Sequence, residues 1–368
     1  MGRSATAITV AFCLCLLLAA SSQAAPLYVI NISVDGLGSS YLQSLVDASQ
    51  VPNFQRFQLE GAWTNNARND YDITVTLPNH VTMVTGRGIQ GTTGHNWTSN
   101  SDPAANQTLH TNKGSYVASV FDVAHDSGLR TGMFATKTKF SLFNTSYNAT
   151  NGAVDATGAD DGRDKLDVYT YNSSSSVLTT ALVSAMNSDP FHYSFVHFTD
   201  GDTAGHSSGW GSTAYNNAIK AVDGYLGSIF NLVETNPALQ GHTTIILTAD
   251  HGGSGYDHSN ASDPLNYTIP FYVWGLDVPA GVDLYAINAS TRLNPGTGRP
   301  NYAAAVQPIR NGELANLSLD LLGLEPVTGS TLNSTQNLAV PEPATVVVLL
   351  TAILLLVPTW GRGRRPQY

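Results

Sequence analysis

Three short motifs in this sequence contain carboxylates and imidazoles, the side chains that bind divalent metal ions in many hydrolases. An aspartate precedes a glycine after one apolar run, an Asp-x-x-x-His motif follows a second run, and an Asp-His-Gly-Gly motif follows a third. With one further histidine, the candidate ligands are Asp35, Asp202, His206, Asp250, His251 and His258. An Asp and a His four residues apart lie on the same side of a helical turn and can bind one ion. Six oxygen and nitrogen ligands suit two divalent ions, with zinc as the first choice and manganese as the alternative.

Each motif also has an ordinary structural explanation when it is taken alone. Asp-Gly is common in turns, Asp-x-x-x-His arises by chance in many chains, and Asp-His-Gly occurs in ordinary loops. Here each motif follows an apolar run that predicts a buried strand, and this joint occurrence favours a metal site.

Thr76 is the candidate nucleophile. A helical pattern follows it and Pro78 falls in the first turn, so the sequence predicts Thr76 as a helix N-cap. A capping threonine without any chemistry is the alternative. A hydroxyl at a helix N-terminus also lies where the helix dipole favours an alkoxide and an incoming phosphate. Metal coordination would lower its pKa further and let it attack phosphorus in line, so the two roles are compatible.

The elements that must position these residues follow from the apolar pattern. Strands are predicted at residues 27–34, 131–135, 193–198, 243–248 and 269–274, and helices at residues 116–127, 176–186 and 215–232. This alternation predicts an α/β fold with a mainly parallel central sheet and helices on both faces. Catalytic groups in such folds gather beyond the carboxyl ends of the strands, where the candidate ligands occur. The polar residues 91–114 and 140–164 predict long loop insertions.

The two ends of the chain have the patterns of sorting signals. Residues 1–24 predict a secretory signal peptide, with a membrane anchor as the alternative. Both cysteines, Cys13 and Cys15, lie inside it, so the mature protein would have no thiol and no disulfide. The remaining organisation is predicted as a catalytic domain at residues 25–329, a polar spacer at 330–339, and an apolar tail with terminal arginines at 340–368.

The charge of the chain argues against one class of partner. The formal net charge is −10, and it becomes about −14 when Arg3 and the three tail arginines are left out. We therefore expect no nucleic-acid-binding face, and positive charge for phosphate chemistry must be local.

The motifs together resemble a known family. Asp35-Gly36, Thr76-Leu77-Pro78-Asn79-His80, Asp202 to His206 and Asp250-His251-Gly252 occur in the order typical of type I phosphodiesterase/nucleotide pyrophosphatases. These motifs and the strands around them extend over residues 27–271. Over this range the chain resembles this branch of the alkaline phosphatase superfamily. The resemblance implies an alkaline-phosphatase-like fold and an exported two-metal phosphohydrolase with a covalent phospho-threonine intermediate. The substrate would be a small phosphate ester, either a phosphodiester or nucleotide pyrophosphate, or a phosphomonoester.

The resemblance also implies how the ligands divide between the two ions. One zinc ion would be bound by Asp35, Thr76, Asp250 and His251, and the other by Asp202, His206 and His258.

The same resemblance implies two phosphate-binding elements. Asn96 follows Thr76 by about twenty residues, where the family has an asparagine that binds a phosphate oxygen; an ordinary loop amide is the alternative. Lys137 and Lys139 resemble a Lys-x-Arg pair of some single-domain alkaline phosphatases, with lysine in place of arginine. Two solvated lysines are the alternative. If the pair binds the extra oxygen of a monoester, the enzyme would be an alkaline phosphatase-type phosphomonoesterase.

The tail resembles a second known signal. Pro341-Glu342-Pro343 before an apolar segment is similar to the PEP-CTERM sorting signal of Gram-negative bacteria. This implies an exosortase partner and transient anchoring in the inner membrane. The mature protein would lie in the periplasm, on the outer surface or in the extracellular matrix; a permanent anchor is the alternative.

Three other functions fit the sequence less well. A sulfatase needs a cysteine or serine in a Cys/Ser-x-Pro-x-Arg motif, and the Thr76 motif lacks the arginine. A cofactor-independent phosphoglycerate mutase needs a serine nucleophile and a large inserted domain. A catalytically inactive matrix protein on the same fold would not need the intact ligand set.

Overall fold

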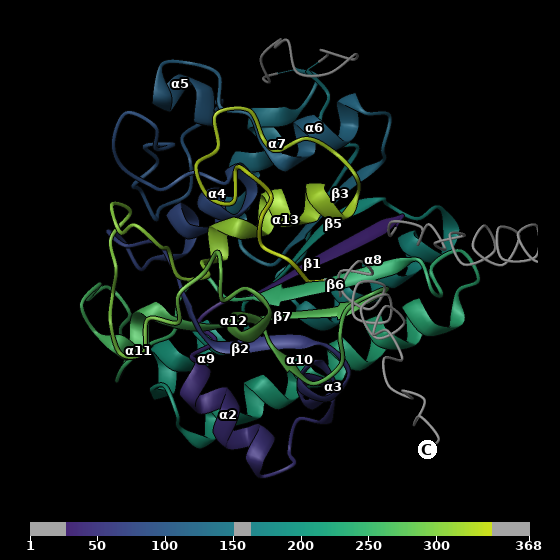
Figure 1. Cartoon of the computed structure of the whole chain (residues 1–368). Coiled ribbons are helices and arrows are strands. Elements are labelled where there is room, and N and C mark those ends of the chain that lie inside the picture. Colours follow the sequence, from purple (N-terminus) through teal and green to yellow (C-terminus); the bar gives the residue numbers. More distant parts are fainter. Residues whose placement is uncertain (1–26, 151–162, 341–368) are drawn as a thin grey trace, which may run out of the picture.

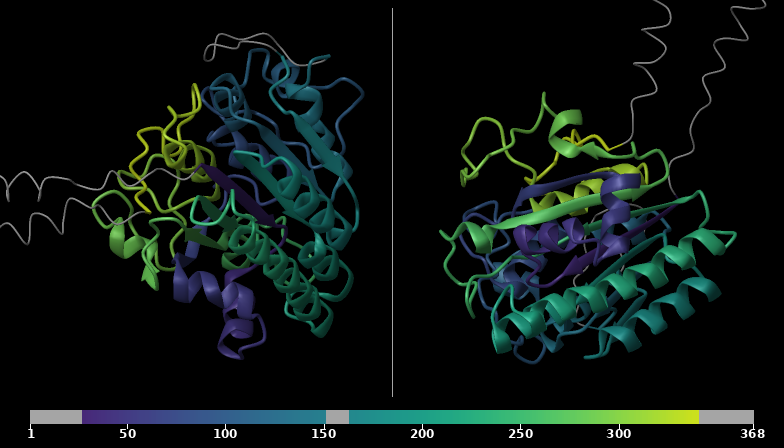
Figure 2. Two further views of the ribbon diagram at one scale, coloured as in Figure 1. Left: turned by 90° about the vertical axis from the view of Figure 1, so that its right-hand side faces the viewer. Right: turned by 90° about the horizontal axis from the view of Figure 1, so that it is seen from below.

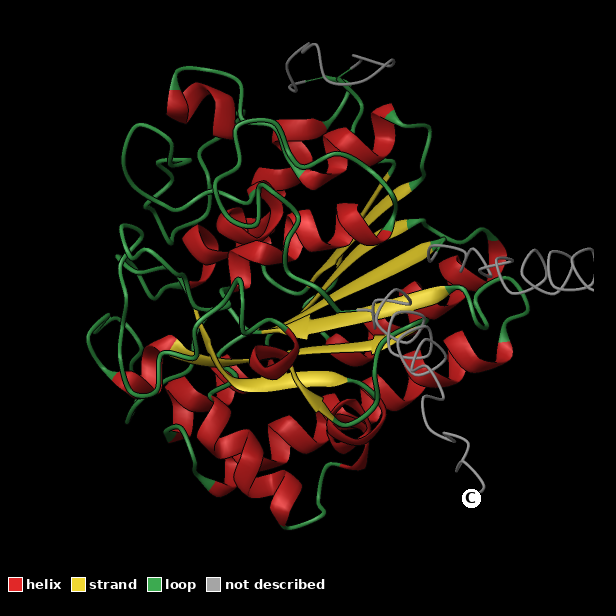
Figure 3. Cartoon of the chain, viewed as in Figure 1, coloured by secondary structure: helices red, strands yellow, loops and turns green. Residues whose placement is uncertain are grey.

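A computed structural model of the chain describes residues 27–150 and 163–340, in which one eight-stranded sheet lies between two layers of helices (Figure 1, Figure 3). The strand order is β4-β3-β5-β1-β6-β7-β2-β8. The strands are β1 (Tyr28–Val34), β2 (Ala62–Arg68), β3 (Thr131–Ala135), β4 (Val168–Tyr171), β5 (Tyr193–Phe198), β6 (Thr243–Thr248), β7 (Thr268–Gly275) and β8 (Val282–Asp283).

Most of the sheet is parallel. The five strands from β4 to β6 in the spatial order run parallel to one another. β7 is antiparallel to both β6 and β2, and β8 pairs in parallel with β2. Every residue of β3, β5 and β6 is buried, as expected for strands covered on both faces. The prediction of an α/β fold with a mainly parallel sheet is confirmed.

Helices cover both faces of this sheet (Figure 2). On one face lie α4 (Thr76–Thr85), α6 (Val120–Asp126), α7 (Ser141–Tyr147) and α13 (Leu314–Leu321). On the other lie α2 (Ser39–Asp47), α3 (Pro52–Glu60), α8 (Ser175–Ser188), α9 (Asp200–Ser208) and α10 (Thr213–Thr235). Short helices α5 (Leu109–Lys113), α11 (Pro264–Tyr267) and α12 (Leu284–Ile287) occur in the loops.

The strands that the apolar pattern predicted are present, whereas three others had no such pattern. β3, β5 and β6 have the predicted bounds, β1 begins one residue later than predicted, and β7 is one residue longer at each end. The sequence missed β2, β4 and β8. β2 contains the polar pair Asn65-Asn66, β4 is half-exposed, and β8 has only two residues, so none of them is an apolar run.

One helix prediction and two loop predictions need correction. The helix predicted at residues 116–127 begins at Val120, because the N–H of Ser119 donates to Asp122 Oδ2 at 2.7 Å in a capping box. The predicted loop 91–114 contains α5, whose N-terminus has a capping box formed by Thr108 and Thr111. The predicted loop 140–164 contains α7, and its residues 151–162 lie outside the described chain.

The segment predicted as a polar spacer packs onto the domain. Leu338 is fully buried, and the N–H of Ala339 donates to Asn288 Oδ1 at 2.7 Å. The predicted signal peptide at residues 1–24 lies outside the described residues, as does the predicted PEP-CTERM tail at residues 340–368 apart from the buried Val340. Within the described part of the chain, no helix combines the length and apolarity needed to cross a membrane.

Candidate metal and phosphate site

The three candidate aspartates meet at the carboxyl edge of the parallel strands. β1 pairs with β5 and β6 in registers that place Asp35 beside the segments leading to Asp202 and Asp250. The N–H of Asp202, in the first turn of α9, donates to the carbonyl of Asp35 at 3.0 Å. Asp35 and Asp250 are fully buried, and Asp202 is 5% exposed. Three carboxylates so close together in the protein interior require compensating positive charge.

Each aspartate has one oxygen bound by the chain and one oxygen without a hydrogen bond. Asp250 Oδ1 accepts the N–H groups of Gly36 and His251, at 3.1 and 2.9 Å. Oδ2 of Asp35 and Oδ2 of Asp202 both contact Lys137. The other oxygens, Asp35 Oδ1, Asp202 Oδ1 and Asp250 Oδ2, are buried and have no hydrogen-bond partner among the described residues. Because such oxygens are costly to bury, this pattern fits ligands of divalent cations.

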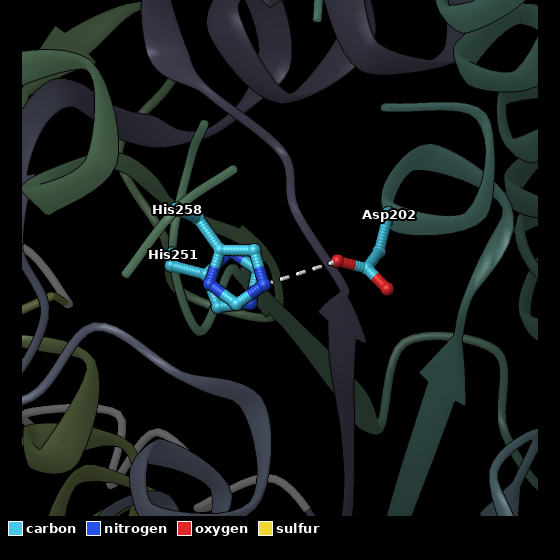
Figure 4. Close-up of side chains that lie close together, drawn as sticks. All are labelled: Asp202, His251 and His258. Atoms are coloured by element: carbon cyan, nitrogen blue, oxygen red, sulfur yellow. Dashed lines mark ion pairs between the residues drawn. The ribbon is translucent and has the colours of Figure 1, made fainter. Parts of the chain in front are cut away.

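Asp202, His206 and His258 have the spacing of one metal site. His206 Nε2 lies 3.3 Å from Asp202 Oδ1, His258 Nε2 lies 3.6 Å from the same oxygen, and the two imidazole nitrogens are 3.1 Å apart. Ligands of a tetrahedral zinc ion, with bonds of about 2 Å, are separated by ~3.3 Å. Figure 4 shows Asp202 and His258 directed toward each other, with the ring of His251 beside that of His258. These three residues therefore fit one ion.

The second set of ligands surrounds His251. Its Nε2 lies 3.1 Å from Asp250 Oδ2, 3.5 Å from Asp35 Oδ1 and 3.4 Å from the hydroxyl of Thr76. Together with the first set, this arrangement brings all seven residues predicted as ligands to one place. The rings of His251 and His258 stack with centroids 3.6 Å apart, so the two sets are adjacent.

Backbone carbonyls orient the three candidate histidine ligands. The Nδ1 atoms of His251, His258 and His206 lie 2.8, 2.7 and 3.0 Å from the carbonyl oxygens of Gly252, Thr74 and Tyr256, respectively. Since a carbonyl can only accept, Nδ1 is the donor and Nε2 is free to bind an ion.

Burial and a nearby carboxylate affect the charge of these rings differently. Burial lowers the pKa of His251 to about 3 and also lowers the pKa of His258, so both are neutral ligands at pH 7. The nearby carboxylate of Asp202 raises the pKa of the more exposed His206. A bound cation would replace that proton.

Lys137 is the cationic side chain that balances part of this negative charge. Its Nζ lies 2.6 Å from Asp35 Oδ2 and 2.7 Å from Asp202 Oδ2. Burial alone would raise the pKa of Asp35, but Lys137 and His197 hold it well below its usual range. Burial, and then the charge of Asp35, raise the pKa of Asp250 well above its usual range. One lysine thus does not neutralise all three carboxylates, which leaves charge for metal ions to balance.

Thr76 has a different position in its helix from the one predicted. The N-cap of α4 is Val75, whose side chain cannot cap, and Thr76 is the first helical residue. Asn100 performs part of the capping instead, because its Oδ1 accepts the N–H of Leu77 at 2.9 Å. The hydroxyl of Thr76 is buried beside His251 rather than bonded to its own helix. The predicted N-cap role is wrong, and the hydroxyl is directed to the ligand set.

Asn96, predicted to bind a phosphate oxygen, lies away from the ligand set. Its amide is exposed and within hydrogen-bond distance of Gly91 and Lys113. A second asparagine of the same loop, Asn100, contacts the first turn of α4. Lys139 donates to the carbonyl oxygen of Asn100 at 2.6 Å and to its Oδ1 at 3.1 Å. Asn100 is therefore closer to the Thr76 end of α4 than the asparagine that the spacing indicated.

Two further buried histidines lie beneath the ligands. His197 was missed by the sequence analysis, whereas His80 was not predicted as a ligand. His197 in β5 donates through Nε2 to Asp35 Oδ2 at 2.9 Å. His80 in α4 contacts the carbonyl of Thr76 at 2.7 Å and the hydroxyl of Ser33 at 2.8 Å. Burial lowers the pKa of both rings. A histidine inside an otherwise apolar strand was the available signal for His197.

Comparisons with known proteins identify the family of this chain. The model of the family "Type I phosphodiesterase / nucleotide pyrophosphatase" matches residues 29–309. Human GPI ethanolamine phosphate transferase 1 is 28% identical over 145 residues, which cover 37% of this chain and 15% of that protein. The Neurospora crassa protein of the same name is 31% identical over 121 residues, covering 33% of this chain and 11% of its own. The chain therefore matches only a small part of these relatives.

Solved structures show the same architecture. Murine ectonucleotide pyrophosphatase/phosphodiesterase 5, as an inactive variant in complex with AMP, has a TM-score of 0.55 and 16% identity, with 81% of this chain and 95% of that chain covered. A variant of the alkaline phosphatase PafA with four substitutions has a TM-score of 0.58 and 12% identity, with 87% and 99% covered. At these identities the likeness concerns the fold, whereas the family match together with the fold indicates a phosphoester-cleaving enzyme. This protein belongs to the type I phosphodiesterase/nucleotide pyrophosphatase family, on an alkaline-phosphatase-superfamily fold.

Proposed function

We propose that this protein is a two-metal phosphoester hydrolase in which Thr76 is the nucleophile. The observation that carries the proposal is the set of three buried carboxylate oxygens without hydrogen-bond partners, grouped with imidazole nitrogens next to the Thr76 hydroxyl. Asp35, Thr76, Asp250 and His251 would hold one ion, and Asp202, His206 and His258 the other. When bound, the ions supply Lewis-acid stabilisation of phosphoryl charge and lower the pKa of the threonine hydroxyl.

The residues of the chain then act in two displacements. Thr76 Oγ1, after losing its proton to solvent, attacks phosphorus, and the bond from phosphorus to the leaving alcohol breaks. The alcohol takes a proton from solvent and departs, leaving phospho-threonine. Water then attacks phosphorus, the bond to Oγ1 breaks, and Thr76 regains a proton. Asn100 Oδ1 is occupied by Leu77 and Lys139, so its Nδ2 is the donor available to a phosphoryl oxygen.

A second candidate, phosphomonoesterase activity, is favoured by the two lysines. A monoester has one more negative oxygen than a diester and needs positive charge beyond the metal ions. Lys137 contacts one aspartate of each ligand set, and Lys139 contacts Asn100, so both lie beside the expected phosphoryl position.

Paired assays on one metal-loaded sample test these proposals. We expect turnover of p-nitrophenyl phosphate, of bis-p-nitrophenyl phosphate, or of both, with about two ions bound per chain. A folded, metal-loaded protein that cleaves neither ester would support an inactive protein on this fold. The ratio of the two kcat/KM values decides between monoester and diester preference.

We also propose that the enzyme acts outside the inner membrane. The support is the pattern of a signal peptide at residues 1–24 and of a PEP-CTERM tail at residues 340–368, whose processing would involve an exosortase. The substrate would be a small phosphate ester rather than a nucleic acid, because the acidic net charge disfavours binding of a nucleic acid.

A further inference from the structure

Trp210, in the turn between α9 and α10, contacts three of the four chain segments that carry candidate metal ligands. Its indole Nε1–H donates to the carbonyl of Gly36 at 2.8 Å, beside the first aspartate. Its backbone N–H donates to the carbonyl of Gly255 at 2.8 Å. The centroid of its ring lies 5.1 Å from that of His206 and 5.8 Å from that of His258. One side chain therefore joins the ends of β1 and α9 to the loop after β6.

Two glycines make room for the indole. A Cβ added at Gly205 would come within 2.5 Å of the Trp210 ring, and one at Gly253 within 2.1 Å. Neither glycine has a positive φ, so backbone conformation does not require glycine at these positions. Gly205 directly precedes His206, and Gly253 follows His251 by two residues. The indole is thus packed between the backbones of two ligand segments.

We propose that Trp210 is a positioning residue that sets the distance between these segments and hence the affinity for the ion at Asp202, His206 and His258. The ring is rigid and only 7% exposed, so it acts as a fixed spacer between backbones that carry the ligands. Metal ligands tolerate only small displacements, and outer partners that orient them commonly change affinity by 10–100-fold. The inference rests on the proposed metal-binding function.

Metal affinity of purified variants tests this role directly. The variant is Trp210→Phe, and the matched control is Trp274→Phe. The control also removes an indole donor, because Trp274 Nε1–H donates to Glu60. Trp274 pairs with Ile245 near the start of β6, whereas the candidate ligands follow the ends of the parallel strands. Competition with a chromophoric chelator should show about a tenfold or larger loss of zinc affinity in Trp210→Phe and none in the control. Equal affinities in Trp210→Phe and wild type would overturn the inference.

A glycine substitution gives a second test that does not depend on the loss of the indole donor. Gly205→Ala should reduce zinc affinity, because the new Cβ collides with the ring. In the Trp210→Ala background the same substitution should have a much smaller effect. If Gly205→Ala is equally harmful with and without the tryptophan, the spacer role is wrong.

Fluorescence keeps the inference testable if a variant folds poorly. Zinc added to the metal-free wild type should change tryptophan emission, since the indole lies beside two ligand rings, and Trp274→Phe should retain that change. A change that persists in Trp210→Phe would contradict the role. Failure of the wild type itself to bind zinc would instead refute the proposed function.

Discussion

The Nζ atom of Lys137 lies 2.6 Å from Oδ2 of Asp35, in the fully buried centre of the site. The same atom lies 2.7 Å from Asp202 Oδ2, so one lysine contacts an aspartate of each ligand set. Burial alone would lower the pKa of Lys137, but the two carboxylates raise it, and the side chain is a permanent cation. A cation in this position can attract a dianionic phosphoryl group as well as balance the aspartates.

Replacing that cation should alter substrate preference. We expect Lys137→Ala to lower kcat/KM for a phosphomonoester by about 10²–10³-fold and for a diester by less than tenfold, because only the monoester presents the extra negative oxygen. Lys220→Ala, in the middle of α10, is the control and should change neither value. Equal losses on both esters would refute the monoesterase argument and would favour the phosphodiesterase function instead.

Removing the metal ions should abolish turnover. Chelation followed by dialysis should give an inactive protein, and zinc, or failing that manganese, should restore activity. Asp250→Asn should lower kcat/KM by at least about 10²-fold and reduce bound metal, whereas Asp47→Asn, on the exposed side of α2, should do neither. Metal content and turnover are measured on the same samples, and full activity in a metal-free sample would exclude the two-metal mechanism.

We expect substitution of Thr76 to reduce activity alone, and substitution of Asn100 to reduce both activity and stability. Thr76→Ala should nearly eliminate turnover with little change in Tm, since Thr76 is not the cap of α4, and Thr76→Ser should retain part of the activity. Asn100→Ala should lose activity and also about 1 kcal/mol of unfolding free energy, because Leu77 N–H loses its partner. Tm and kcat are measured together for each variant. A stable, fully active Thr76→Ala protein would show that the nucleophile lies elsewhere.

His95 should contribute to the loss of stability in acid. Burial, and then the charge of Arg87, lower its pKa to about 3, whereas an unfolded histidine has a pKa near 6.5. Between about pH 6.5 and 3 the unfolded state therefore binds a proton that the folded state does not. Stability should fall with decreasing pH in this range, at up to ~1.4 kcal/mol per pH unit from this residue. His95→Asn, whose amide oxygen can still accept the N–H of Trp97, should show a smaller slope in denaturant unfolding. Parallel slopes for the two proteins would contradict the assignment.

Processing of the chain ends can be read from intact mass. The exported protein should lack residues before about Ala25 and should end near Pro341-Glu342-Pro343. A cell-associated protein that retains Trp360 and the terminal arginines would instead indicate a permanent anchor.

The sequence by itself determined the fold class and predicted the residues that lie together in the candidate ligand set. Buried parallel strands are apolar throughout, so β3, β5 and β6 could be located to the residue, and the polar residues directly after such strands had to lie at one edge of the sheet. Motif order then identified Asp35, Thr76 and Asp250 without any distance.

Only the tertiary structure decided how these residues are supported. Asn100 and Trp210 reach the site through contacts between segments that are separated in the chain, which leave no periodic or local signal. The position of Asn96 away from the ligand set could not be read from its spacing, because spacing counts residues whereas an amide reaches its partner through space. Half-exposed and very short strands such as β4 and β8 depend on pairing with neighbours rather than on their own apolar pattern. Residue types determine which chemistry is possible, whereas the packing of the backbone determines which residues lie close enough to form a site.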